Sequence, residues 1–233
     1  MAGDVVITYE LVDGVATIRM DDGMVNALSL TMLTAIGEAI DRAEADDAAI
    51  VLAGRDGRFS AGFDLGVLNA GGLDAVAMLR AGFETSLRLL SHPRPVVLAI
   101  TGHAIAMGSF LTLSGDHRIG IAGGGHRIHA NEVVIGLTMP RAAIEICRQR
   151  LTPAGFERAV TLAEAFTHDE AVAVGFLDSV VDGDVVAAAQ ETATTFASTL
   201  DRHAHKATKL RTRGAMLGRL REAIDVDMAE LGG

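Results

Sequence analysis

Apolar and polar residues alternate in two runs near the start of the chain, from Val5 to Glu10 and from Val15 to Met20. Between the runs stands Asp13-Gly14, a pair that favours a tight turn between antiparallel strands. The alternation therefore predicts a β-hairpin.

A helical period then replaces the alternation. Apolar residues recur three or four positions apart at Leu30, Leu33, Ile36, Ile40 and Ala43, and Ser29 is suited to cap the start of this helix. Ala49 to Ala53 is a short apolar run that ends at Gly54 and predicts a buried strand.

The same two patterns repeat in the next segment. A second amphipathic helix is indicated by Val76, Leu79, Phe83, Leu87 and Leu90, and a second buried strand by the run from Val96 to Thr101. Strands that alternate with helices of this length indicate an α/β fold with a largely parallel sheet covered on its faces.

From Pro140 onward the pattern is almost entirely helical. We expect helices at Arg141 to Leu151, Pro153 to Glu164, His168 to Val174, Asp184 to Leu200 and His203 to Arg221. The division that follows is a core over residues 1–139 and a helical C-terminal region over residues 140–233, joined in one structural unit.

Composition narrows the class of protein. The chain has 233 residues, of which 49% are hydrophobic, and a net charge of −10, which disfavours a nucleic-acid partner. The single cysteine, Cys147, stands at helical spacing and is expected to be a buried apolar residue. No apolar leader or membrane-length run is visible in the sequence, so we expect a cytoplasmic protein without a membrane partner.

Several common motifs are absent. The glycines around residues 102–108 do not have dinucleotide-binding or P-loop spacing, and Ser60 in GRFSAG does not have the spacing of a hydrolase nucleophile. His126 and His129 lack neighbouring residues with zinc-ligand spacing, so no metal site is expected.

Two segments rich in small residues are more informative. They are Arg58 to Leu65 and Thr101 to Leu111, where backbone could approach a ligand closely and where a helix start could offer N–H groups to a developing anion. Close packing of helices is the alternative explanation for each segment.

Together the segments resemble the crotonase, or enoyl-CoA hydratase/isomerase, superfamily. The resemblance runs through MDDGMVNAL at residues 20–28, SAGFDL at 60–65, ITGHAIAMGSFLTLSGDHRI at 100–119 and ANEVVIGLTMP at 130–140. It implies a spiral of β-β-α units, a C-terminal helical trimerisation region, and a homotrimer or a dimer of trimers. It also implies an acyl-CoA or enoyl-CoA substrate, with no cofactor beyond the coenzyme A of that substrate.

By motif position, the resemblance assigns the binding groups. The backbone amides of Phe63 and Met107 would hold the thioester oxygen as an enolate forms. Ala61 lies where the family's backbone contacts the adenine, and Lys209 resembles a lysine that reaches the phosphates of coenzyme A.

The resemblance also bears on the reaction. Family hydratases use two glutamates; here Phe110 stands at the position of the first, and Glu132 at that of the second. A single carboxylate is sufficient to move a proton from C2 to C4 of a 3-enoyl-CoA, and the pattern is similar to that of monofunctional 3,2-enoyl-CoA isomerases. The alternatives are a hydratase with a substitute acid, such as Glu145 or a histidine, and an acyl-CoA-binding protein with weak or no catalysis.

Three further residues near these motifs receive no catalytic assignment. Asp64 is expected to accept backbone hydrogen bonds in a turn or helix cap. His103 and His129 could titrate near neutral pH, but no motif gives either a role.

Overall fold

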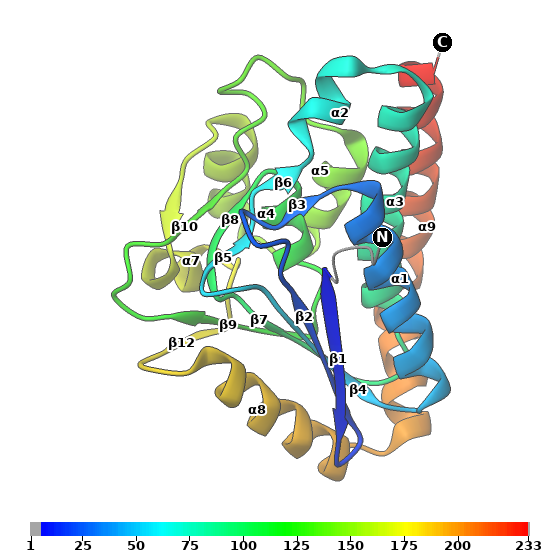
Figure 1. The fold of residues 1–233 in the computed structure, drawn as a ribbon, viewed down its shortest axis with the longest axis vertical. Helices are drawn as coiled ribbons and strands as arrows, with labels where there is room; N and C mark the ends of the chain where they lie inside the picture. Colours follow the sequence, from blue (N-terminus) through cyan, green and yellow to red (C-terminus); the bar gives the residue numbers. More distant parts are fainter. Residues whose placement is uncertain (1–5, 233) are drawn as a thin grey trace.

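The larger of two principal β-sheets runs through the middle of the molecule (Figure 1). In this computed structural model, which describes residues 6–232, the sheet has six strands. In spatial order they are β1 (Ile7–Val12), β2 (Val15–Met20), β4 (Ala49–Ala53), β7 (Val96–Ala99), β9 (His117–Ile121) and β12 (Ser179–Val181).

The second sheet has four strands. Their spatial order is β11 (Phe166–Thr167), β10 (Arg127–His129), β8 (Gly102–Ile105) and β5 (Gly57–Ser60). A parallel pair, β3 (Ala27–Leu28) and β6 (Gly62–Phe63), forms a small separate sheet.

From β4 to β10 the chain alternates between the two main sheets, apart from the short strand β6. The strands β4, β7 and β9 are neighbours in the larger sheet, and each is followed along the chain by one of the neighbours β5, β8 and β10. Each turn of the chain therefore adds one strand to each sheet. This arrangement confirms the α/β spiral that the resemblance implied.

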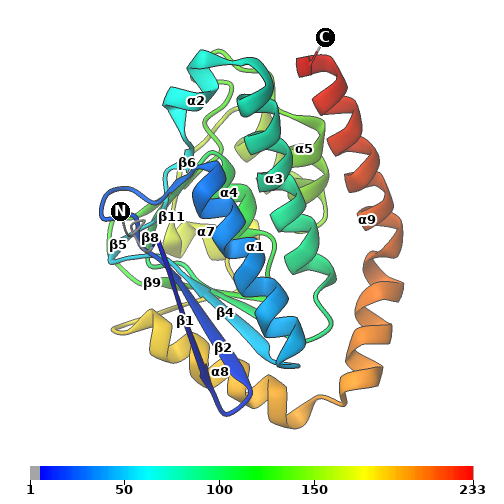
Figure 2. The same cartoon turned by 45° about the vertical axis from the view of Figure 1, so that its right-hand side comes forward.

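Helices cover both faces of the larger sheet. On one side, α1 (Leu30–Ala45), α3 (Gly72–Ser91) and α9 (Arg202–Gly232) lie side by side (Figure 2), and α8 (Val185–Thr199) packs on β2, β4, β7 and β9 from the other side. The remaining helices are short: α2 (Leu65–Ala70), α4 (Met107–Thr112), α5 (Arg141–Arg148), α6 (Pro153–Phe156), the π-helical turn η1 (Glu157–Thr161) and α7 (His168–Val174).

Strand β4 shows why its sequence is apolar at every position. Ile50 and Leu52 point into the large core on the side of α1 and α3, whereas Ala49, Val51 and Ala53 belong to a smaller core beneath α8. A strand with both faces buried needs apolar residues on both, so it shows no alternation.

The N-terminal elements follow the expected pattern. The hairpin pairs Val12 with Val15, and Asp13 and Gly14 both have positive φ, as a two-residue hairpin turn requires. The expected first residue of this strand, Val5, lies outside the described residues. Ser29 caps α1, where its hydroxyl accepts a hydrogen bond from the Met32 amide.

The C-terminal half differs from expectation in three places. It contributes the last strand of each sheet, β11 and β12, which the helical pattern did not reveal. The helix expected over residues 153–164 is divided into α6 and the π-helical η1, where the Leu162 amide donates to the carbonyl five residues earlier. The helical segment ends before Ala163, which has a φ of 48°. The last helix extends eleven residues beyond Arg221, to Gly232.

Across residues 6–232, no helix combines the length and the apolar character needed to cross a membrane.

Candidate active site

Three expected site residues follow three neighbouring parallel strands. Strand β8 pairs in parallel with β5 on one side and with β10 on the other. Phe63 follows β5, Met107 follows β8, and Glu132 follows β10. Because parallel strands end at the same edge of a sheet, this topology brings the three residues to one edge of the four-stranded sheet.

Hydrogen bonds fix the segment that leads to Phe63. The buried Asn26 donates from Nδ2 to the Met20 carbonyl at 3.0 Å, and its own carbonyl accepts from Ser60 Oγ at 2.8 Å. Ser60 Oγ in turn accepts from the Gly62 amide at 3.1 Å. A hydrogen bond from Ser60 to the Asn26 backbone therefore joins the first motif to the second.

The segment that leads to Met107 has an unusual backbone. The amide of Ala106 donates to the His129 carbonyl at 2.8 Å, and Ala106 has a φ of 49°, which non-glycine residues rarely adopt. Met107 is the first residue of α4, so its N–H has no acceptor in the preceding turn of a helix.

The two segments touch. A Cβ on Gly62, which has a φ of 90°, would lie 2.9 Å from Ala106 Cβ and 3.3 Å from the Met107 nitrogen. Glycine is therefore required at this position both by its backbone conformation and by the close approach of β6 to α4. Gly62, the residue before Phe63, therefore lies directly against the backbone of Met107.

The side chains of α4 face the core. Met107 and Phe110 are each 1% exposed and belong to the large apolar core. The residue at the expected first-glutamate position is thus a buried phenyl ring, which can neither accept nor donate a proton.

Glu132 is a buried carboxyl group without a charged partner. Its residue is 7% exposed, and its Oε2 has no hydrogen-bond partner within residues 6–232. Burial disfavours the charged form and raises the pKa of Glu132 to about 7. This group can therefore accept and return a proton near neutral pH.

Cys147, on α5, is fully buried, as expected. Burial raises the pKa of its thiol, and the charge of the nearby Glu132 raises it further. The thiol stays protonated at neutral pH and is not a nucleophile.

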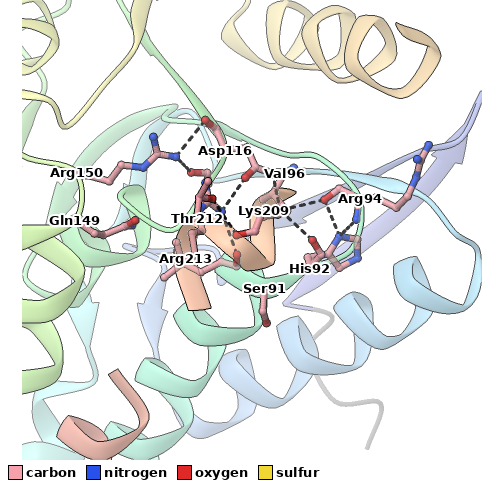
Figure 3. A network of polar contacts seen from close by, with 12 residues as sticks. Ser91, His92, Arg94, Val96, Asp116, Gln149, Arg150, Lys209, Thr212 and Arg213 are labelled. Carbon is pink, nitrogen blue, oxygen red and sulfur yellow. Dashed lines mark hydrogen bonds and ion pairs between the residues drawn. The ribbon is translucent and has the colours of Figure 1, made fainter. Parts of the chain in front are cut away.

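Lys209, which the resemblance assigns to the phosphates of coenzyme A, is enclosed in this structure. Its ammonium group is enclosed beneath α9, where it contacts Asp116 Oδ2 at 2.7 Å and the carbonyls of His92 and Arg94 at 2.9 and 3.3 Å (Figure 3). Lys209 is 6% exposed, and these contacts engage all three N–H donors of an ammonium group. Lys209 therefore stabilises the fold here and presents no donor to a phosphate.

The other expected residues have simpler positions. Ala61 is exposed, and its amide donates to the Val25 carbonyl. Asp64 caps α2 by accepting from Gly66 and Val67, which confirms the structural role. The alternative acid Glu145 accepts a hydrogen bond from Arg219 at 2.8 Å.

The two unassigned histidines bind backbone. His129 contacts the Ala163 carbonyl through Nε2, and His103 Nδ1 accepts from the Arg127 amide. Ala106 and Gly82 both border the site, but the sequence analysis did not identify them. A glycine within an otherwise helical pattern is the one signal that could have pointed to Gly82.

Comparison with known proteins agrees with this topology. The model of the enoyl-CoA hydratase/isomerase family matches residues 10–230. The human protein named mitochondrial enoyl-CoA delta isomerase 1 is 30% identical over 219 residues, which are 92% of this chain and 72% of that protein.

Two solved structures are more similar in sequence. An enoyl-CoA hydratase from Mycobacterium marinum is 49% identical, with a TM-score of 0.93 over 97% of this chain and 100% of that chain. A Mycobacterium tuberculosis protein is 48% identical, with a TM-score of 0.92 over 97% of this chain and 98% of that chain; it is named an enoyl-CoA isomerase in one solved structure and a probable enoyl-CoA hydratase in another.

Proposed function

Because this chain belongs to the enoyl-CoA hydratase/isomerase family, we propose that it converts 3-enoyl-CoA thioesters to 2-enoyl-CoA thioesters. Two observations carry the proposal. Glu132 is a buried carboxyl group whose Oε2 has no hydrogen-bond partner within residues 6–232, and Phe110 is a buried phenyl ring at the position where a hydratase has its other acid.

The reaction needs one proton carrier and one anion site. The Glu132 carboxylate removes a proton from C2, and the electron pair of that C–H bond moves toward the thioester oxygen as an enolate. The amides of Phe63 and Met107 donate hydrogen bonds to that oxygen. Glu132 then returns the proton to C4, and the double bond moves into conjugation with no change in mass.

The pKa of Glu132 supports this role. A base whose pKa is about 7 is substantially ionised at neutral pH, yet its conjugate acid is strong enough to return the proton. The buried Phe110 favours proton return over hydration, because it offers no group that could bind a water molecule on the other side of the substrate.

A hydratase is the second candidate, since the Mycobacterium marinum relative is named as one. Adding water requires a second acid or base, and Glu145 is already paired with Arg219 in this chain. The proposed isomerase needs no such group.

The deciding experiment supplies the purified protein separately with a 3-enoyl-CoA and a 2-enoyl-CoA. Absorbance of the conjugated thioester and product mass are followed. Isomerisation predicts that the first substrate becomes conjugated at constant mass and that the second is not hydrated. Rapid addition of water to the second substrate would support the hydratase, and binding without turnover of either would support an acyl-CoA-binding protein.

For the remainder of the ligand, we propose that the exposed backbone of Ala61 contacts the adenine of coenzyme A. We also propose that the protein assembles as a homotrimer or a dimer of trimers. Light scattering coupled to size-exclusion chromatography tests the assembly, and a monomer in solution would contradict it.

A further inference from the structure

The side chains of Phe63 and Met107 meet at one glycine of a neighbouring helix. A Cβ on Gly82 of α3 would lie 2.4 Å from Cε1 and 2.5 Å from Cζ of Phe63. The same Cβ would lie 3.7 Å from the terminal methyl group of Met107. The Phe63 ring therefore occupies the space that a side chain at residue 82 would need, beside the Met107 methyl group.

The surroundings restrict where the Phe63 ring could go. The next residue on α3, Phe83, is 1% exposed, and its ring meets the Phe63 ring edge to face with centroids 6.1 Å apart. The Phe63 ring thus contacts two successive residues of one helix. A side chain at residue 82 would force this ring to move. The Phe63 backbone lies three residues beyond Ser60, whose hydrogen bonds anchor the strand.

Intrinsic helix preference does not account for this glycine. Gly82 lies inside the 20-residue helix α3, where glycine is less favourable than every residue except proline. The space beside it is filled by Phe63 rather than by another helix backbone. Its evident contribution is room for that ring.

We propose that Gly82 is a positioning residue for the two backbone donors. By admitting the Phe63 ring beside the Met107 methyl group, it sets the spacing between the Phe63 and Met107 amides. The inference rests on the proposed function, in which these amides hold the enolate oxygen. Gly82 acts through the two side chains and does not itself contact the substrate.

The substitution Gly82→Ala tests the proposal directly. Displacing a donor by about 1 Å is sufficient to lower a rate by roughly a hundredfold, so we expect kcat for a 3-enoyl-CoA to fall about 10- to 100-fold. KM should change far less, because the donors strengthen their bonds mainly as the enolate forms. The matched control is Gly218→Ala on α9, where an added Cβ meets no atom within 4 Å.

A second variant pair separates the specific contact from a general loss of packing. Leucine at residue 63 lacks the Cε1 and Cζ atoms that a Cβ at residue 82 would strike. Adding Gly82→Ala to the Phe63→Leu variant should therefore cause little or no further loss. This comparison remains informative if the single Gly82→Ala variant does not fold.

A spectroscopic measurement keeps this inference distinct from the isomerase proposal. Acetoacetyl-CoA forms an enolate that absorbs ultraviolet light, and an enolate site should increase that absorbance on binding. We expect Gly82→Ala to reduce the increase and Gly218→Ala to preserve it, even if the wild-type protein isomerises no 3-enoyl-CoA. Normal kcat and normal enolate absorbance in Gly82→Ala would overturn the inference. An equal loss of kcat when Gly82→Ala is added to the wild-type protein and to the Phe63→Leu variant would also overturn it.

Discussion

Glu132 and Asp116 are both largely buried carboxyl groups, but their surroundings push their pKa values in opposite directions. Burial raises the pKa of Glu132 to about 7, and no cation among residues 6–232 opposes this effect. Burial also acts to raise the pKa of Asp116, but Lys209 and Arg213, which contact it at 2.7 and 2.8 Å, outweigh that effect and lower it (Figure 3).

Asp116 has a structural role, whereas Glu132 is the proposed proton carrier. Asp116 also accepts from the Val96 amide and so ties α9 to the start of strand β7. Its charge is fully compensated, so it does not exchange protons near neutral pH. Glu132 has an unsatisfied oxygen and is held at a pKa suited to proton transfer. Two buried carboxyl groups therefore differ in pKa because their partners differ.

The largest effect is expected from removing the proposed catalytic carboxylate, Glu132. We expect Glu132→Gln to lower kcat by about 10²–10⁴-fold, the usual contribution of a general base, while CoA-ester binding is retained. Steady-state kinetics and calorimetric binding measure the two quantities. The matched control, Glu145→Gln, should keep kcat within about threefold. Full activity in Glu132→Gln would contradict the assignment.

Neutralising the other carboxyl group should affect stability instead. Asp116→Asn leaves Lys209 and Arg213 buried without their anion, so we expect the free energy of unfolding to fall by about 3–5 kcal/mol. Chemical denaturation measures it. Asp56→Asn, at a carboxylate that is 96% exposed, should change it by no more than about 0.5 kcal/mol. An equal effect of both changes would contradict the proposed stabilising role of the cluster.

The pH dependence of the rate sharpens the contrast. The base must be ionised, so kcat/KM should rise with pH and level off above about 7, the pKa of Glu132. At pH 5 we expect a value about a hundredfold below the plateau, which follows from two pH units below that pKa. A profile that is flat from pH 5 to 8 would show that Glu132 is not the group that titrates.

The smallest expected effect is on the free energy of unfolding, which the buried Glu132 carboxylate lowers at high pH. Its pKa is higher in the folded protein than the ordinary value of 4.5, so stability is lost as pH rises through about 7. Glu132→Gln should therefore raise the free energy of unfolding by about 1–3 kcal/mol at pH 8 and change it little at pH 4. Denaturation at both pH values measures this difference. An equal gain at both would exclude ionisation as the cause.

Much of the fold could be predicted from local pattern. The hairpin, α1 and β4 were evident because a strand or an amphipathic helix leaves a clear period in the sequence. β11 and β12 were not, since strands of two and three residues are too short to show one. The change to π-helical hydrogen bonding after Phe156 leaves no period in the sequence, and the left-handed Ala163 that follows this turn is not distinguishable in sequence from an ordinary alanine.

The candidate site was predictable to a different extent. Motif position proposed Phe63, Met107 and Glu132, and the parallel strands that precede them end at one sheet edge. Motif position could not show that the Lys209 side chain turns inward to Asp116, because that contact depends on a segment distant in the sequence. Gly82 was missed because its role depends on a ring from a distant segment of the chain.

The inward position of Lys209 also affects how this protein withstands its proposed substrate. Thioesters acylate amines, whereas guanidinium groups do not form amides with them under such conditions. The chain has only two lysines, Lys206 and Lys209, among twenty basic residues. With Lys209 enclosed by Asp116 and two carbonyls, Lys206 is the one lysine open to spontaneous acylation. Because arginine supplies most of its positive charge, we expect little spontaneous acylation of this protein by thioesters.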